Sequence, residues 1–143
     1  MMTRSRAREE VIKMTEVRGE FKVTGWHEET YADRKPGKLT HASGTQEFSG
    51  AIVGTGGIEW LMCYQEDGTA TYVGMQVIDA TLDARRGSFV LTANGEFNGS
   101  TSEGEWTIVP GSGRGDLGGI TGSGSFKAGP GPQATFQLEY HIG

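Results

Sequence analysis

The sequence has little of what would assign the protein to an oxidising compartment or to a membrane. Its one cysteine, Cys63, cannot form an internal disulfide and lies in an apolar run, where we expect a small buried side chain. No stretch reaches the length of a membrane span, and residues 1–16 lack the apolar segment that a secretory signal needs. These absences predict a soluble, cytoplasmic protein.

Positive charge is also scarce. Thirteen lysines and arginines stand against 18 aspartates and glutamates, so the formal net charge is −5. A surplus of negative charge argues against nucleic acid or an anionic membrane as a partner. The basic residues cluster mainly near the start of the chain, where glutamates partly offset them. We therefore expect neither nucleic acid nor a membrane to bind.

Long helical patterns are missing, and short β-like runs take their place. From Gly19 onward, runs rich in β-branched and aromatic residues are separated by glycines and polar turns. The runs cover residues 19–26, 39–53, 57–66, 70–83, 87–98, 102–110, 118–127 and 133–142. They predict a single all-β domain over residues 17–143, either an antiparallel barrel or a sandwich. Residues 1–16 are expected to form a flexible N-terminal arm, frayed or as a short helix.

Two of the predicted strands are apolar on both faces. Residues 133–142 alternate between apolar and polar side chains, so one face of that strand is wet. Residues 58–64 and 70–78 do not alternate in this way, which indicates packing on both sides. One side would be the interior and the other a subunit contact, so we expect a homo-oligomer.

The segment 109–126 contains seven glycines, and Gly113, Gly115 and Gly118 have the spacing of a dinucleotide-binding loop. Such a loop needs a helix after it, so that the helix N-terminus meets the phosphates. The residues after Gly118 read instead as another glycine-punctuated strand. We therefore interpret the glycines as corners and bulges of a small barrel, and we expect no nucleotide and no other cofactor.

The stretches "IEWLMCY", "GSFVL" and "VPGSGRGDL" resemble the bacterial domain-of-unknown-function family 3224 (DUF3224), and the resemblance extends from Gly19 to Ile142. That family looks like a member of the allene oxide cyclase barrel group. The resemblance implies an eight-stranded barrel of the allene oxide cyclase-like type, with "VPGSGRGDL" as a scaffold corner. It also suggests isomerisation, cyclisation or elimination on a small apolar molecule without a cofactor.

Glu59 is a carboxylate inside the apolar run 58–64. Facing a dry barrel interior, it would have a raised pKa and could act as a catalytic base or acid near neutrality. Facing outward, it would meet solvent or a subunit partner, and the sequence leaves both orientations open. Further residues could bind substrate as lining of the interior, with core packing as the alternative for each: Trp60, Tyr64, Tyr72, Gln76, Trp106 and Tyr140.

No metal site is predicted. His27, His41 and His141 lie far apart in the sequence and have no metal-ligand spacing.

Two functions from different classes fit these residues. The first is a cofactor-free acid–base catalyst of the isomerase, cyclase or lyase type, which acts on a small hydrophobic molecule with Glu59 as the proton-transfer residue. The second is a non-catalytic carrier or sensor that shelters a hydrophobic ligand, for which ring and amide side chains suffice. A barrel filled with its own side chains, acting only as an assembly unit, is the third alternative.

Overall fold

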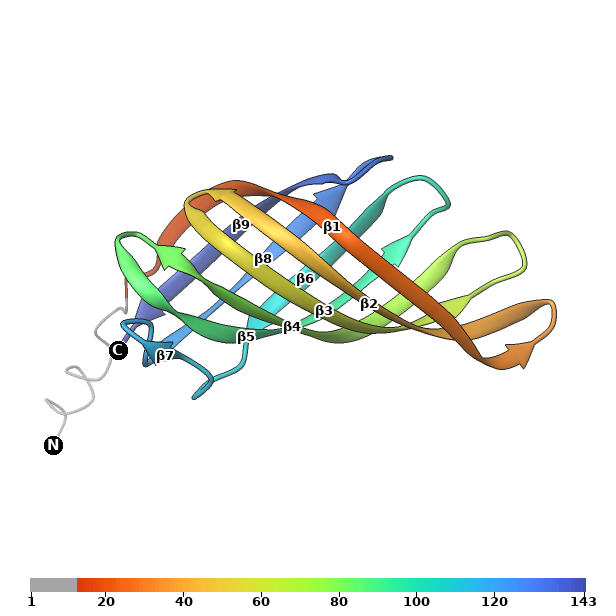
Figure 1. Ribbon diagram of the computed structural model, residues 1–143, viewed down its shortest axis with the longest axis horizontal. Coiled ribbons are helices and arrows are strands. Elements are labelled where there is room, and N and C mark those ends of the chain that lie inside the picture. Colours follow the sequence, from red (N-terminus) through yellow and green to blue (C-terminus); the bar gives the residue numbers. More distant parts are fainter. Residues whose placement is uncertain (1–12) are drawn as a thin grey trace, which may run out of the picture.

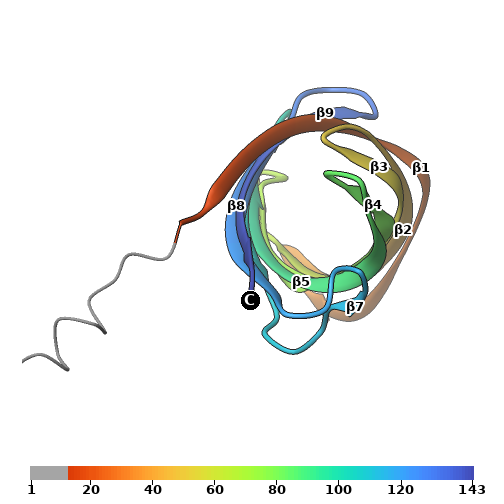
Figure 2. The same ribbon diagram turned by 90° about the vertical axis from the view of Figure 1, so that its left-hand side faces the viewer.

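In a computed structural model, which describes residues 13–143, the chain forms a closed β-barrel (Figures 1 and 2). The strands are β1 (Thr15–Arg34), β2 (Gly37–Gly50), β3 (Ile52–Tyr64), β4 (Ala70–Leu82), β5 (Arg85–Phe97), β6 (Ser102–Ile108), β7 (Arg114–Gly115), β8 (Ile120–Ala128) and β9 (Gln133–Ile142). All pairings among them are antiparallel.

Eight strands close the barrel, and the short β7 lies outside it. The strand order is β4-β3-β2-β1-β9-β8-β6-β5, and the pairing of β4 with β5 joins the two edges. β7 pairs only with the start of β5, through Gly87 with Gly115 and Ser88 with Arg114. Closure pairs both edges of each wall strand over the body of the barrel, whereas β1 pairs with β9 only up to Lys22 and its edge beyond Val23 extends past β9. The predicted eight-stranded antiparallel barrel is confirmed. No helix within residues 13–143 could cross a membrane.

The first two strands are longer than the sequence predicts. β1 continues to Arg34 and forms a hairpin with β2, whereas the sequence predicts that the strand ends at residue 26. The predicted strand 39–53 is divided by a turn at Gly50, whose φ of 90° is accessible to glycine. The polar composition of residues 27–38 conceals this hairpin, because few of its side chains enter the apolar core.

The predicted N-terminal arm falls mostly outside the described residues. Residues 1–12 of the arm are not described, and β1 already begins at Thr15. Thr15 and Glu16 pair with Tyr140 and Glu139 of β9, so these last two residues of the predicted arm belong to the barrel wall.

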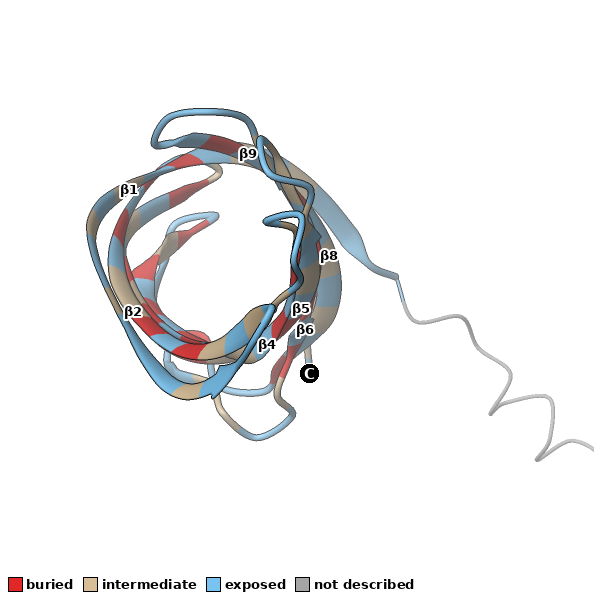
Figure 3. Cartoon of the chain, turned by 90° about the vertical axis from the view of Figure 1, so that its right-hand side faces the viewer, coloured by how far each residue is buried: buried red, intermediate tan, exposed pale blue. Residues whose placement is uncertain are grey.

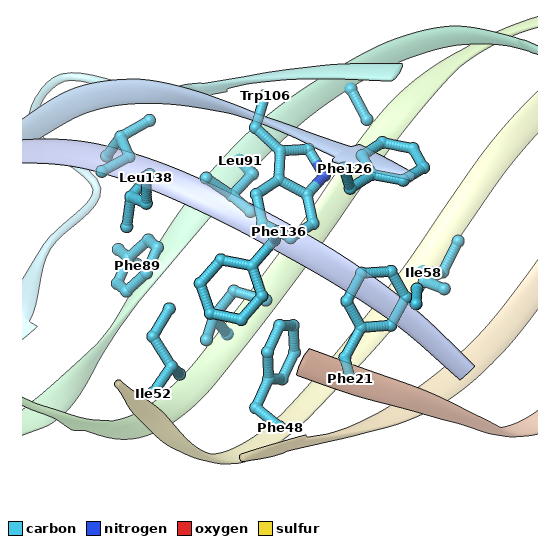
Figure 4. Packing of buried hydrophobic residues seen from close by; sticks show 14 of the residues in the cluster. Phe21, Phe48, Ile52, Ile58, Phe89, Leu91, Trp106, Phe126, Phe136 and Leu138 are labelled. Carbon is cyan, nitrogen blue, oxygen red and sulfur yellow. The ribbon is translucent and has the colours of Figure 1, made fainter. Parts of the chain in front are cut away.

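Aromatic rings fill the middle of the barrel (Figure 4). The Trp106 ring lies at its centre, with its centroid 5.3 Å from that of Phe126 and 5.6 Å from that of Phe136. Phe21 and Phe48 pack from the opposite wall, with centroids 5.4 Å apart. Each such pair stabilises the fold by about 0.5–1.5 kcal/mol beyond the burial of its apolar area. The middle of the barrel is therefore a packed core.

A hydrogen-bonded chain of polar side chains crosses this core. The Trp106 indole N–H donates to Oε1 of Gln76 at 3.1 Å, and Nε2 of Gln76 donates to Oε1 of Gln46 at 3.0 Å. Gln46 and Gln76 are each 1% exposed. Nε2 of Gln46, at the end of the chain, has no acceptor among residues 13–143.

The glycine-rich connection between β6 and β8 closes one end of the barrel. It inserts Leu117, which has no exposed surface, into the core beside Ile120. At Gly113 a side chain would collide with the carbonyl oxygen of Leu117, and Gly115 has a φ of 66°. These two glycines are structurally required, as predicted. At Gly118 an added methyl group would have its nearest neighbour, the carbonyl oxygen of Gly115, 3.5 Å away, so this position does not demand glycine.

Candidate functional site at the open end

Opposite the end that Leu117 closes, the barrel is open. The β1–β2 and β3–β4 hairpins extend beyond the rest of the barrel at the right of Figure 1, and Figure 3 looks into this end. The two hairpins enclose a cleft of about 800 Å³. Its innermost residues are Glu28, Thr40 and Tyr64, and the hairpin residues 33–38 and 65–68 contribute most of its rim. We call this space the open-end cleft.

Glu28 is a carboxylate on the inner face of the barrel wall. It lies directly opposite Ala42 of β2, which is fully buried, and the two side chains of a cross-strand pair lie on the same face of the sheet. One carboxylate oxygen accepts a hydrogen bond from the buried Thr40 hydroxyl at 2.6 Å, and the other accepts from the Trp26 indole N–H at 3.0 Å. Glu28 is therefore held in one orientation at the base of the cleft.

These partners keep Glu28 charged. Partial burial by itself would raise the pKa of its carboxyl, but hydrogen bonds from Thr40, Trp26 and Tyr64, together with the Lys38 ammonium, lower it below the ordinary value of 4.5. The pKa of the Tyr64 phenol is raised, first by burial and then by its hydrogen bond to the Glu28 carboxylate and the charge of that group. At neutral pH the cleft thus contains an anion beside a protonated phenol.

An ammonium group already lies against the aromatic face of this cleft. Lys38 pairs with Tyr64 across β2 and β3, and its Nζ lies 5.3 Å from the centroid of the Tyr64 ring. This is the geometry of a cation–π contact. The ring is thus oriented to accept a positively charged group at a short distance from the Glu28 carboxylate.

More rings form the wall that joins the cleft to the core. Trp60 stacks on Tyr72 with centroids 4.3 Å apart, and Trp26 packs edge-on against Trp60 at 5.9 Å. Trp26 is 45% exposed, whereas Trp60 and Tyr72 are buried. The indole N–H of Trp60 is buried and has no acceptor within the described part of the chain. Of these three rings Trp26 alone offers exposed surface at this end, and Trp60 with its unpaired donor lies buried behind it.

The structure separates the six predicted binding residues into three places. Trp60, Tyr64 and Tyr72 meet at the open end. Gln76 and Trp106 belong to the hydrogen-bonded chain of the packed core. Tyr140 is buried toward the opposite end, where its hydroxyl donates to Asp83 at 2.9 Å and where burial, followed by that hydrogen bond, raises its pKa.

Glu59 lies on the outside of the barrel, which is the outward one of the two orientations that the sequence leaves open, so it does not face a dry interior as the catalytic hypothesis requires. Its side chain is 66% exposed, and its Oε1 lies 2.6 Å from Nε2 of His41. The neighbouring Ile58 and Trp60 point inward. Cys63, on the same face as Glu59, is likewise exposed rather than buried. An apolar strand with two apolar faces does not reveal which face is internal, and here the odd-numbered residues face out.

The sequence analysis missed Glu28 because the predicted strand ends at residue 26, and a β-bulge before Glu28 would have misplaced its side chain even in a longer predicted strand. Phe21 and Val23 point inward as odd-numbered residues, but the pairing shifts between Val23 and Gly25. After the shift the even-numbered Trp26 and Glu28 take the inner face, opposite Gly44 and Ala42. A bulge inserts one residue and reverses the alternation, so reading the period onward from Phe21 places Glu28 outside.

A second hollow, of about 1240 Å³, is lined by residues of β1, β2, β5, β6, β8 and β9. Its charged side chains include Arg18, Glu96 and Lys127, all of them exposed. Exposed charges are well solvated and bind weakly to a ligand. This groove is therefore a weaker candidate than the open-end cleft. Within residues 13–143, no three histidine, cysteine or acidic side chains are grouped to hold a metal ion.

Comparison with known proteins places the chain in a family. Residues 17–140 match the family described as protein of unknown function, DUF3224. The chain belongs to this family. A crystal structure of a DUF3224 protein of unknown function from Shewanella oneidensis MR-1 is similar to it, with a TM-score of 0.78 and 27% sequence identity over 92% of this chain and 99% of that one. Among curated proteins, none matches.

Membership in DUF3224 confirms the family part of the sequence resemblance and agrees with the barrel fold. The narrower likeness to allene oxide cyclases stays a prediction, because the family match and the similar structure both name DUF3224 alone.

Proposed function

We propose that this DUF3224 barrel is a binding protein that shelters a small organic cation with an apolar body in its open-end cleft. The observation that carries the proposal is the Glu28 carboxylate, fixed by Thr40 and Trp26 beside a Tyr64 ring that already holds the Lys38 ammonium on its face. An aromatic face next to a fixed anion is the arrangement by which proteins recognise ammonium groups. The cleft volume of about 800 Å³ also lies within the range of small-molecule sites.

Binding fits the cleft better than proton transfer does. A general base is most useful when its pKa lies near the working pH, but the pKa of Glu28 is lowered. The Tyr64 phenol is a poor acid at neutral pH, because its pKa is raised. Glu59 is solvated on the outer face. The carrier or sensor is therefore the function that these residues support best.

The test compares a cation with its neutral analogue of the same shape. We would titrate the protein with choline and with 3,3-dimethylbutan-1-ol, in which carbon replaces the ammonium nitrogen, and follow binding by calorimetry and by NMR shifts of the tryptophan indole signals. Choline is expected to bind about 10-fold or more tightly than the neutral alcohol, and the Trp26 and Trp60 signals should shift. Equal affinities, or no binding of either probe, would contradict the proposal.

Variants locate the site. Glu28→Gln and Tyr64→Leu should each weaken choline binding by about 10-fold, because one removes the anion and the other the ring. Glu29→Gln is the matched control, since Glu29 is exposed on the outer side of the same strand, next to His27. Lys38→Gln removes the ammonium that competes for the Tyr64 face, so it should strengthen choline binding. Loss of binding in Glu29→Gln would place the site elsewhere.

A further inference from the structure

The outer face of β3 and β4 carries an unusual number of exposed apolar side chains. Leu61, Val73, Met75 and Val77 are each about half exposed, at 49%, 52%, 55% and 53%. Isolated exposed apolar residues are common on soluble proteins, but contiguous groups mark interaction sites. These four residues therefore indicate an interaction site if they are contiguous on the surface.

The strand register shows that they are. Leu61 lies directly opposite Val73, and Met75 and Val77 follow Val73 at alternate positions along β4. Val90 of β5 pairs with Val77 and extends the apolar surface by one strand. We call Leu61, Val73, Met75 and Val77 the apolar stripe. It runs along the strands rather than across them.

We propose that a second copy of this chain covers the apolar stripe, so that two barrels pack side by side as a two-fold dimer. A barrel wall is convex across its strands, and two such walls meet along a line that follows the strands. The stripe has this shape. A two-fold axis brings the same patch of both subunits together, so apolar residues meet apolar residues on both sides.

The charges around the stripe favour an identical partner. His41 and Glu59 form a pair at 2.6 Å along one side, and Asp79 and Arg86 form a pair beyond Val77. Glu59 and Asp79, the acids next to the stripe, each have a basic neighbour, which limits like-charge repulsion when two copies of the face meet. A strongly acidic or basic partner would gain nothing from this rim.

The available area is that of a small interface. With about 3.4 Å per residue along a strand and about 4.8 Å between strands, the outer face of β3 and β4 from Val53 to Cys63 projects to roughly 330 Å². Side-chain relief and the flanking edges of β2 and β5 add to this area, whereas a standard interface buries about 800 Å² per partner. The face therefore fits a dimer at the low end of the range of interface sizes.

The experiment measures the mass of the full chain in solution by light scattering after gel filtration. The wild type is expected at twice the mass of the chain, and Met75→Glu, which places a charge in the centre of the stripe, at the mass of one chain. Met75→Leu, which stays apolar, should remain dimeric. Thr135→Lys on the exposed wall of β9 is the control for a new charge elsewhere and should also remain dimeric.

Three results would overturn the proposal. One is a monomeric wild type, which would assign the stripe to a different protein, and another is a dimer that survives Met75→Glu. The third is a dimer lost in Thr135→Lys, because that would place the interface on another wall. Thermal unfolding of each variant distinguishes dissociation from misfolding, since all of these side chains are exposed and their exchange should leave the barrel folded.

Discussion

The two ends of this barrel are built from the same strands but are finished in opposite ways. At one end the β6–β8 connection inserts Leu117 into the core, and the buried Tyr140 hydroxyl is satisfied by Asp83. At the other end the β1–β2 and β3–β4 hairpins project past the core and hold a charged carboxylate, Glu28, among partly exposed rings.

The difference shows how one small fold keeps the residues that stabilise it apart from the residues that we propose bind a ligand. Apolar burial at the closed end stabilises the barrel, because each large side chain removed from water contributes about 1.5–3 kcal/mol. A fixed anion and an open cleft contribute little to stability, and they fit a ligand instead. Substitutions at the closed end should therefore change the free energy of unfolding, and those at the open end should change binding.

The largest effect is expected at Leu117. Leu117→Ala should lower the free energy of unfolding by about 2–5 kcal/mol, because it removes buried methyl groups and leaves a cavity. Glu28→Gln at the open end should cost much less. Urea unfolding of both variants at one protein concentration measures the contrast. A loss below about 1 kcal/mol for Leu117→Ala would mean that the connection does not close the barrel.

Two glycines of the same connection test its geometry. Gly113→Ala should cost about 1–3 kcal/mol, since the new methyl group meets the Leu117 carbonyl oxygen, which is fixed backbone. Gly118→Ala is the matched control and should be nearly neutral, because its nearest neighbour is 3.5 Å away. Thermal unfolding compares the two variants. Equal losses at both positions would contradict the structural distinction between them.

Alkaline pH tests the hydrogen bond at the closed end. The pKa of Tyr140 is raised above its ordinary value of 10.0, so its contribution to stability is complete below pH 10 and is lost as the pH rises through the folded-state pKa. Tyr140→Phe should cost about 1 kcal/mol at neutral pH and should remove this part of the alkaline loss. Unfolding curves between neutral and alkaline pH provide the measurement. An identical alkaline loss in Tyr140→Phe would assign it to other tyrosines.

Acidic pH tests the open end with the opposite sign. The pKa of Glu28 is lowered, so its contribution is present above pH 4.5 and is lost as the pH falls through the folded-state pKa. The wild type should therefore lose more stability on acidification than Glu28→Gln does. The difference should be well below that at Leu117, because Glu28 is only partly buried. An equal loss of stability on acidification in the two proteins would show that the Glu28 carboxylate is not stabilised by its hydrogen-bond partners.

The smallest effect is expected at Glu59. Its contact with His41 is a surface pair, so Glu59→Gln should change the free energy of unfolding by less than about 1 kcal/mol, and less still at high salt. Choline binding should not change. A large loss of binding would show that the outer face, rather than the open-end cleft, contains the ligand site.

Much of the fold was predictable because local chemistry repeats along it. Turn residues and alternation predicted most strands, and strand 133–142 matches β9 in both bounds. The hairpin around residues 27–38 was missed, because its polar side chains extend past the core and carry no apolar alternation. Trp60, Tyr64 and Tyr72 lie toward the open end and their role in binding stays a prediction, whereas Gln76 and Trp106 belong to the packed core.

The sequence by itself determined the all-β class and the DUF3224 family, because period-two patterns, glycine corners and family stretches are properties of short segments. The pattern left a barrel and a sandwich open, and the family resemblance favoured the closed eight-stranded wall. Only the tertiary structure decided which face of β3 is internal and that Glu28, not Glu59, points inward. Alternation gives the relation between neighbouring side chains but not the side on which the core lies. The bulge after Val23 also exchanges the inner and outer faces of β1, so that even-numbered residues point inward after it, and only the pairing with β2 reveals this exchange.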